Sequence, residues 1–253
     1  MPTYPMTRTP SWGRLRTLAL AASPLLLAGC ASLSADGGLA PVQQAAQQHL
    51  GKTVEIVKSD ADEDKIASRV GELLSQPLNA DSAVQIALLN NRGLQASFQE
   101  LGIAEADMVQ ASRMPNPGFS IARMKRGDER EIERAFSFDL GHLIALPMMR
   151  QLESRRFAAT QRAVAMEMIS LASETRKAFY AAVAAEQTSR YMQDVRATTD
   201  AGAELARRLA QAGNWSKLQQ AREHGFFAEA TLNAARAEQA RLSSRERLIR
   251  LLG

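Results

Sequence analysis

The longest uninterrupted helical pattern in the sequence is MMRQLESRRFAATQRAVAMEMISLASETRKAFYAAVAAEQTSRYMQDVRATTDAGAELARRLAQ, which covers residues 148–211. It holds no proline, its single glycine is Gly202, and strong helix formers such as Ala, Glu, Gln, Arg and Leu dominate it. At 1.5 Å per residue this stretch predicts a helix roughly 95 Å long, whereas helices in compact domains average about 11–12 residues. We therefore expect a mainly helical protein with an elongated coiled-coil part.

Three residues, Ala212-Gly213-Asn214, follow this pattern and predict a tight turn, because Gly and Asn tolerate left-handed backbone geometry. A second helix from about Ser216 to Leu252 is expected to return antiparallel, so that residues 147–253 form one long helical hairpin. Heptad spacing predicts a buried seam, and its many small residues predict close helix approach. The seam positions are Val164, Met168, Leu171, Thr175, Ala178, Ala182, Ala185, Met192, Thr199, Ala203, Ala206 and Ala210.

Upstream of the helical hairpin, residues 116–146 contain two short segments that alternate apolar and polar residues, as β-strands do. A charged stretch with Gly127-Asp128 at its centre separates them and predicts a hairpin turn. Because a lone two-stranded hairpin is marginally stable in water, we expect it to join strands from elsewhere. Its apolar face is predicted to consist of Phe119, Ile121, Phe136, Phe138 and Leu140.

Residues 65–115 predict a first helical segment, which restarts after a pause with Asp81 as its expected N-cap. It stops at Met114-Pro115-Asn116-Pro117-Gly118, since prolines cannot continue the hydrogen bonding of a helix. Residues 30–64 are rich in Gly, Ala, Gln and Asp, with one β-like stretch at 53–57. We predict an extended N-terminal tether for them.

The N-terminus has the pattern of an export signal. Residues 1–29 contain three arginines, no acidic residue and an apolar run too short, at about 16 Å of helix, to cross a hydrocarbon core of roughly 30 Å. The run ends at Leu27-Ala28-Gly29-Cys30, which resembles the lipobox of bacterial lipoproteins. That resemblance implies cleavage before Cys30, acylation of Cys30 and delivery to the outer membrane. The alternative is an ordinary signal peptide followed by a buried free cysteine.

The net charge of +4 includes the three signal arginines, Arg8, Arg14 and Arg16, so the chain from Cys30 onward carries 4 − 3 = +1 and gives no indication of nucleic-acid binding. No glycine-rich phosphate loop or nucleophile motif is present, and we predict no catalytic residue, cofactor or resident metal. The ten methionines are interpreted as core filling. His142, near Met148 and Met149, keeps copper or silver export open as an alternative.

In their order along the chain, these elements resemble one repeat of the TolC-type outer-membrane efflux ducts. The resemblance rests on AVQIALLNN (83–91), similar to the opening helix of the family; AEAD (104–107), similar to its A-x-A helix; RMPNP (113–117), similar to its Pro-Asn-Pro break; and QAGNWSKLQQAR (211–222), similar to its glycine-containing turn. It covers residues 81–251 and implies a TolC-like αββα repeat, in which a long antiparallel coiled-coil hairpin accompanies transmembrane β-barrel strands.

The resemblance also implies partners and places for the predicted sites. The family forms a homotrimer with a twelve-stranded barrel in the outer membrane above a periplasmic helical tunnel. Phe119, Ile121, Phe136, Phe138 and Leu140 would face lipid, and Gly127-Asp128 would lie at the extracellular mouth. Ala212, Gly213 and Asn214 would lie at the periplasmic tip, where a membrane-fusion adaptor docks. An inner-membrane pump of the resistance-nodulation type would supply the energy.

The family carries two repeats per chain, whereas this sequence shows one. A trimer would then have six strands, fewer than the roughly eight of the smallest usual membrane barrels, so we expect a truncated or split protein or a hexamer of half-units. The predicted function is a passive exit duct for drugs, metal ions or other small solutes, without covalent chemistry. The alternative is a structural periplasmic lipoprotein whose helical hairpin serves as a coiled-coil stalk or adaptor.

Overall fold

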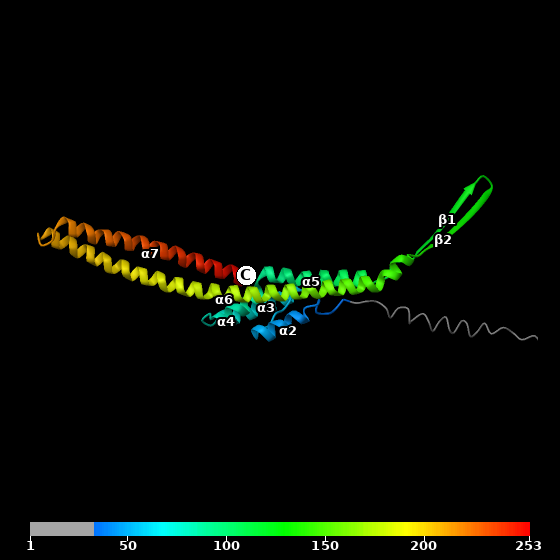
Figure 1. Ribbon diagram of the computed structural model, residues 1–253, viewed down its shortest axis with the longest axis horizontal. Coiled ribbons are helices and arrows are strands. Elements are labelled where there is room, and N and C mark those ends of the chain that lie inside the picture. The colour runs from blue at the N-terminus through cyan, green and yellow to red at the C-terminus, as the bar shows by residue number, and fades with distance from the viewer. Residues whose placement is uncertain (1–32) are drawn as a thin grey trace, which may run out of the picture. The chain divides into compact units, whose positions relative to one another are not determined.

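The computed structural model describes residues 33–253, apart from the side chain of Arg126, so the predicted signal and Cys30 lie outside the described residues. The chain is mainly helical with one two-stranded hairpin, as predicted (Figure 1). Residues 33–35 and 105–155 form one compact unit, and residues 36–104 and 156–253 form another. The elements are α2 (Ala40–Leu50), α3 (Asp60–Leu74), α4 (Ala80–Asn90), α5 (Arg92–Ala111), β1 (Gly118–Arg126), β2 (Glu129–Ser137), α6 (Leu140–Gln211) and α7 (Lys217–Leu252).

The long helix predicted from the sequence is α6, which has 72 residues. It begins at Leu140, so residues 140–146 belong to this helix and not to the β-hairpin region predicted for 116–146. The reason is a helix cap: Asp139 Oδ1 accepts a hydrogen bond from the backbone N–H of His142 at 2.9 Å. Pro147 lies inside the helix, where its ring removes one backbone donor without ending the helix.

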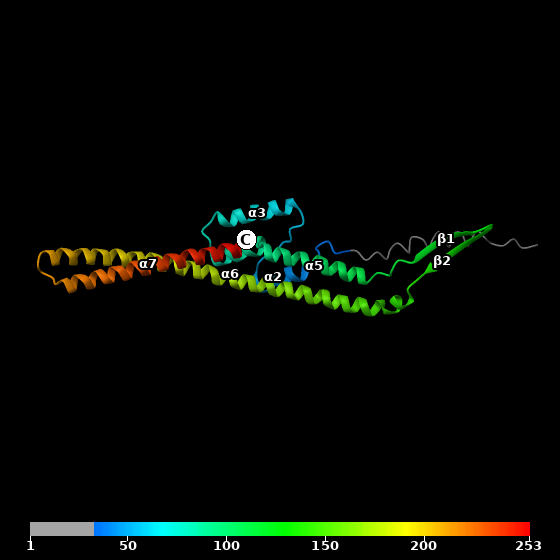
Figure 2. The ribbon, with the colours of Figure 1, turned by 90° about the horizontal axis from the view of Figure 1, so that it is seen from above.

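The predicted return helix is α7, which runs antiparallel to α6 within the unit of residues 36–104 and 156–253 (Figures 1 and 2). Small side chains fill their contact: Ala178 and Ala206 of α6 are buried, as are Ala230, Ala234 and Ala237 of α7. Every predicted seam position of α6 is buried or half-buried, so the heptad assignment is confirmed. The seam also holds Ser189, which hydrophobic spacing missed.

A hydrophobic core joins α2, α4, α5 and α6 within the same unit. Phe98 of α5 is its largest fully buried side chain, and Met168 of α6 is also fully buried. Figure 1 shows α2, α3 and α4 below α6. The other core residues are Leu39, Val42, Ala46, Val54, Val84, Leu88, Leu94, Leu101, Val164 and Ala172.

The extended tether predicted for residues 30–64 is wrong in its described part. Residues 40–50 form α2, with Val42 and Ala46 fully buried, and α3 already starts at Asp60 behind the N-cap Ser59. A short helix with two buried residues gives little periodic signal in a stretch rich in Gly, Ala and Gln. Tertiary burial against α4, α5 and α6 stabilises it where local propensity is not decisive.

The β-like stretch of residues 53–57 forms no strand and is held by glutamine side chains instead. Gln85 of α4 accepts from the Thr53 N–H at 3.3 Å and donates to the Thr53 carbonyl at 2.9 Å. Gln95 of α5 donates to the Glu55 carbonyl at 2.8 Å and accepts from the Val57 N–H at 3.0 Å. An amide side chain offers both donors and an acceptor, as a neighbouring strand would, so these backbone groups are satisfied without a sheet.

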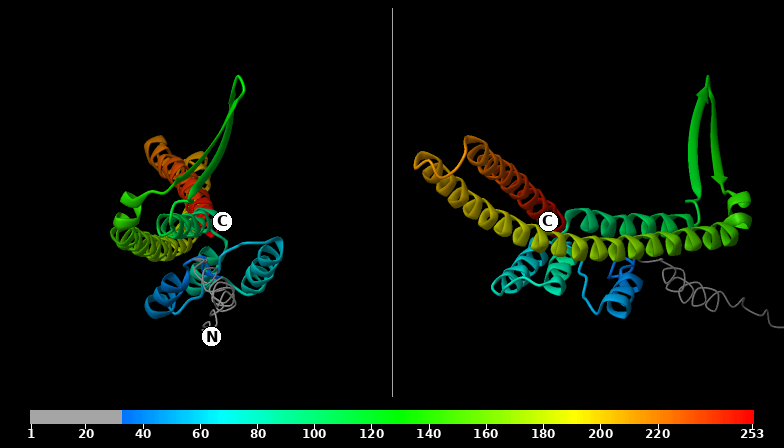
Figure 3. Two further views of the ribbon diagram at one scale, coloured as in Figure 1. Left: turned by 90° about the vertical axis from the view of Figure 1, so that its right-hand side faces the viewer. Right: turned by 60° about the vertical axis from the view of Figure 1, so that its left-hand side comes forward.

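The N-terminus of α5 meets the C-terminus of α7 alongside α6 (Figure 3). Asn91 caps α5 by accepting from the Leu94 N–H at 3.0 Å, and its Nδ2 donates to the Leu251 carbonyl at 3.1 Å. Asn90 Nδ2 donates to the Leu252 carbonyl at 3.0 Å. The last carbonyls of a helix have no partner within the helix, so these two amides bind α7 to the α4–α5 junction.

Two expectations about helix ends have different outcomes. The prediction that helix formation stops before the two prolines is confirmed, because α5 ends at Ala111. Asp81 is not the N-cap of α4; Asn79 is, and its Oδ1 accepts from the N–H groups of Asp81 at 2.9 Å and Ser82 at 2.8 Å. Asp81 instead forms an ion pair with Arg176 of α6 at 3.0 Å.

We expect Phe98→Ala to lower the free energy of unfolding by about 3–5 kcal/mol, because truncation of a fully buried aromatic side chain leaves a cavity. The matched control is Phe226→Ala on α7, where the phenylalanine is 58% exposed and the change should stay within about 0.5 kcal/mol. Urea unfolding followed by far-ultraviolet circular dichroism measures both. Equal costs for the two variants would contradict the position of the core.

Candidate functional sites

The first candidate site is the β1–β2 hairpin, an antiparallel ribbon with Phe119 opposite Phe136. The turn predicted at Gly127-Asp128 is confirmed, and Gly127 has a φ of +64° that suits glycine. Every residue of β2 is exposed, and Phe119 and Phe136 are 67% and 69% exposed. The ribbon therefore presents two adjacent phenylalanines to its surroundings with no cover from the described chain.

The predicted apolar face of this hairpin is confirmed in part. Side chains alternate between faces, so the register places Phe119, Ile121 and Phe136 together. The prediction that Phe138 and Leu140 belong to this strand face is wrong. Strand β2 ends at Ser137, and Leu140 is the first residue of α6. The alternation continues in the sequence, but the Asp139 cap turns the chain into a helix at that point.

The second candidate site is the turn between α6 and α7, predicted at Ala212, Gly213 and Asn214. The Gly213 N–H donates to the Ala210 carbonyl at 3.1 Å and the Asn214 N–H donates to the Leu209 carbonyl at 2.9 Å, which is the Schellman pattern. Gly213 has a φ of +80°, as this pattern requires. The return helix starts with a capping box formed by Ser216 and Gln219.

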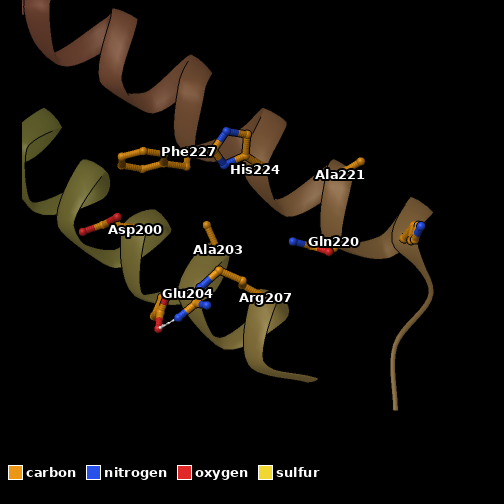
Figure 4. Close-up of a pocket in the computed structure, with 9 residues that line it drawn as sticks. Asp200, Ala203, Glu204, Arg207, Gln220, Ala221, His224 and Phe227 are labelled. Carbon is orange, nitrogen blue, oxygen red and sulfur yellow. Dashed lines mark hydrogen bonds and ion pairs between the residues drawn. The ribbon is translucent and has the colours of Figure 1, made fainter. Parts of the chain in front are cut away.

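Next to this turn the two helices line an open cavity of about 520 Å³ (Figure 4). His224 and Phe227 of α7 lie across it from Ala203 of α6. On α6, Glu204 accepts hydrogen bonds from Arg207 at 2.6 Å and from Arg208 at 2.8 Å. These bonds, that from Arg207 first, lower the pKa of the Glu204 carboxyl to about 2. The pocket thus combines an ionised Glu204 cluster with the rings of His224 and Phe227, which suits insertion of partner side chains.

A polar cluster links α6 to α7 farther from the turn. Arg241 of α7 binds Glu238 at 2.6 Å and reaches Glu186 of α6 at 3.3 Å. Ser189, only 1% exposed, donates to Glu238 at 2.9 Å. The hydrogen bonds from Arg241 and then Ser189 lower the pKa of the Glu238 carboxyl to about 2. This cluster fixes the register of two helices whose alanine seam specifies it weakly.

A third feature lies close to the predicted lipid anchor. The backbone N–H of Ser34 donates to Glu105 Oε1 of α5 at 2.7 Å, and Glu105 is only 5% exposed. Cys30 itself lies outside the described residues. The chain four residues after Cys30 is therefore fastened to the helix that leads into β1.

Two further kinds of site have no candidate among the described residues. Across residues 33–253, no three His, Cys, Asp or Glu side chains are grouped so that they would hold a metal ion. In that same stretch no helix combines the length and the apolar character needed to span a membrane. His142, Met148 and Met149 fall in the first three turns of α6, and Met148 is 78% exposed.

No protein-family profile and no curated protein matches the sequence. Among solved structures, the chain is similar in fold to a membrane protein from Pseudomonas aeruginosa, with a TM-score of 0.60 and 18% sequence identity. The match covers 69% of this chain and 44% of that protein, so the chain spans less than half the length of the protein it matches. At this identity the likeness establishes the fold alone.

The sequence motifs did not predict the residues that connect the helices around these sites. Asn90 and Asn91 belong to the opening motif, but their contacts with the end of α7 lie more than 150 positions away in sequence. Ser189 and Glu238 are polar residues at an apolar seam. A seam predicted from the spacing of apolar residues does not include them.

We expect Gly213→Ala to destabilise the helical hairpin by about 1–2 kcal/mol, because a side chain at φ +80° is strained while open space surrounds the new methyl group. The matched control is Gly225→Ala in the middle of α7, which also meets open space and should stabilise the protein by about 0.5–1 kcal/mol. Urea unfolding measures both. Two changes of the same sign would contradict the turn geometry.

Acid should weaken the contact between α6 and α7 through Glu238, whose pKa falls from 4.5 to about 2 on folding. Because the folded protein holds the ionised form, this stability is complete above the unfolded pKa of 4.5 and is lost as the pH falls through the folded value of about 2. The melting temperature of Glu238→Gln should therefore depend less on pH between 4.5 and 2 than that of the unmodified protein. Circular dichroism melting curves measure it, and Glu246→Gln, at an exposed position of α7, should follow the unmodified protein.

Proposed function

We propose that this chain is a subunit of a TolC-type outer-membrane exit duct, the passive pore of a tripartite efflux system. The exposed hairpin carries the proposal, because Phe119 and Phe136 stand side by side on a ribbon that nothing in the described chain covers. A lone two-stranded ribbon is marginal in water. Closure with other strands into a barrel satisfies both of its edges, which is how strands exist within lipid.

Strand number limits the assembly. Each chain supplies two strands, and membrane barrels of this kind have at least about eight, so a ring needs at least four chains or strands from a continuation of the polypeptide. Six copies would give the twelve strands that the TolC resemblance implies. The coverage of 44% of the matched membrane protein agrees with a unit that corresponds to about half of a larger protomer.

The contact between Ser34 and Glu105 supports a common membrane for the anchor and the hairpin. A chain of four residues reaches at most about 14 Å, so an acylated Cys30 would remain within that distance of Ser34. Ser34 is bound to α5, and α5 leads through the Pro-Asn-Pro turn into β1. Acyl chains and exposed phenylalanines would then enter the same lipid layer.

The helical hairpin of α6 and α7 would form the wall of the periplasmic tunnel. Solutes would move through a water-filled interior, and no residue would carry out covalent chemistry. The turn at Gly213, with the cavity beside it, would receive the membrane-fusion adaptor, because insertion of partner side chains suits a cavity of about 520 Å³ with an aromatic wall. An inner-membrane pump would supply the energy.

One observation favours the alternative of a periplasmic coiled-coil stalk. On the predicted lipid-facing side, apolar residues end at the row of Arg123 and Ile132. From the row of Phe119 to that row the strand rises about 13 Å, against an apolar band of about 25 Å in membrane barrels. A stalk needs no such band, and its hairpin would stay in water.

The depth of the hairpin distinguishes the two functions. In the chain cleaved before Cys30, Trp215 beside the α6–α7 turn is the only tryptophan, so Phe136→Trp adds one reporter. We expect brominated phospholipids to quench the tryptophan fluorescence of Phe136→Trp strongly in reconstituted vesicles, because this side chain faces lipid in a barrel.

The matched control is Ala135→Trp, the adjacent residue on the opposite face of the ribbon. It should show no more quenching than Trp215 alone, since it would face the pore. Absence of quenching at both positions would support the stalk and reject the duct. Equal quenching at both would reject the predicted orientation of the two faces.

A further inference from the structure

The hairpin separates its charges by face. Odd-numbered residues of β1 and even-numbered residues of β2 share one side of the ribbon, because side chains alternate along each strand and the register pairs Phe119 with Phe136. We call this side the basic-apolar face; it consists of Phe119, Ile121, Arg123, Lys125, Arg130, Ile132, Arg134 and Phe136. The other side carries the acidic residues of β2, which are Glu129, Glu131 and Glu133.

The basic-apolar face changes in composition along the ribbon. Its first row is the phenylalanine pair, and its second row pairs Ile121 with Arg134. Its third row pairs Arg123 with Ile132, and the last row, next to the turn, contains only Lys125 and Arg130. Six residues separate the first row from the last, or about 20 Å at 3.3 Å per residue. The face therefore passes from wholly apolar to wholly cationic over the depth of one lipid leaflet.

The cations of this face lack partners of opposite charge. Within the part of the chain that the structure describes, no carboxylate forms an ion pair with Arg123, Lys125, Arg130 or Arg134. Lys125 and Arg130 stand directly opposite each other, and like charges in that position are destabilising. An anion placed over this row would remove the repulsion.

We propose that the basic-apolar face binds the phosphate groups of anionic lipids at the membrane surface, while its phenylalanine row lies in the acyl layer. This inference rests on the proposed function, since the face meets lipid only if the hairpin is inserted. Arginine presents several N–H donors in a plane that matches phosphate oxygens, and lysine adds a point charge. Lys125 and Arg130 then lie at the headgroup level, Arg123 and Arg134 extend toward it from the neighbouring rows, and the acidic side of β2 faces away from the lipid.

A lipid surface fits this face better than phosphate in solution. Phosphate in solution would engage the row of Lys125 and Arg130 but would leave the 67% and 69% exposed Phe119 and Phe136 in water. A leaflet satisfies both ends of the face, since acyl chains take the aromatic pair and headgroups take the cations. The position of the cations also accounts for the short apolar band, because long basic side chains at the end of a membrane segment extend to the headgroups.

The test uses the acylated full-length protein reconstituted into two kinds of vesicle, one of phosphatidylcholine and one with about a third phosphatidylglycerol, enough to give a negative surface. The readouts are the melting temperature of the oligomer and the number of phosphatidylglycerol molecules that stay bound in native mass spectrometry. The main variant is Arg123→Gln/Lys125→Gln/Arg130→Gln/Arg134→Gln. The charge-matched control is Arg222→Gln/Arg236→Gln/Arg247→Gln/Arg250→Gln, at exposed positions of α7.

We expect the unmodified oligomer and the α7 control to melt at a higher temperature in the anionic vesicles and to retain phosphatidylglycerol. The main variant should lose that difference and bind the lipid at least about tenfold more weakly, since each basic residue near an anionic surface contributes about fivefold. Arg123→Lys/Arg130→Lys/Arg134→Lys, which keeps the charge, should retain most of the difference. The single variant Arg130→Gln should lose part of it, which keeps the test valid if the main variant does not fold.

Other outcomes overturn the proposal in distinguishable ways. Insertion of the unmodified protein with no difference between the two vesicles rejects this proposal and leaves the duct intact. The same difference in the main variant, or an equal stabilisation by inorganic phosphate added to phosphatidylcholine vesicles, also rejects lipid recognition by this face. Failure of the unmodified protein to insert into either vesicle rejects the proposed function and this proposal together.

Discussion

A 72-residue helix is stable in water only where other segments bury its apolar seam, and the larger unit of the structure is organised around this constraint. Along α6, the core helices α2, α4 and α5 cover one stretch, and α7 covers the next. The amides of Asn90 and Asn91 join the two coverings by binding the final carbonyls of α7. Neither α5 nor α7 covers the whole of α6. Because the end of α7 is bound to the start of α5, the buried seam of α6 continues from the contact with α5 to the contact with α7.

Where the seam consists of alanine, packing is close but weak in register. Small side chains bring α6 and α7 together over many turns, yet they offer few shapes that would resist sliding. The two contacts that cross between the helices, from Ser189 to Glu238 and from Arg241 to Glu186, supply that resistance, because each holds at one alignment only. The turn at Gly213 fixes the other end, through a backbone geometry that glycine adopts without strain. A long, regular tunnel wall would need both devices.

The hairpin follows the opposite rule, because its apolar residues have no cover in the described chain. Burial within the described chain does not stabilise it, and a lone pair of strands is marginal in water, so further stabilisation has to come from contacts beyond these residues. Its charge separation suits a strand pair with lipid on one side and water on the other. On the proposed function, the predicted anchor at Cys30, the contact between Ser34 and Glu105, and the basic-apolar face would all act at one membrane surface.

Strong local sequence patterns predicted most helices and turns correctly. The predictions that failed concern segments whose structure depends on contacts distant in sequence. The long helix, the turn at Gly213 and the turn at Gly127-Asp128 were predictable because each depends on residues within a few positions of one another. The tether predicted for residues 30–64 and the hairpin end at Leu140 were wrong, since α2 depends on burial by distant helices and Asp139 caps a helix. The β-like stretch at 53–57 forms no strand because glutamine side chains bind its backbone.

The sequence by itself determined a mainly helical chain with one β-hairpin, through periodicity, proline and glycine. Only the tertiary structure decided which segments cover α6, how Asn90 and Asn91 connect α5 to α7, and which charges share a face with the phenylalanines. The physical reason is that periodicity records which side of an element is apolar, whereas partner and register depend on hydrogen bonds and packing between residues that lie far apart in the chain.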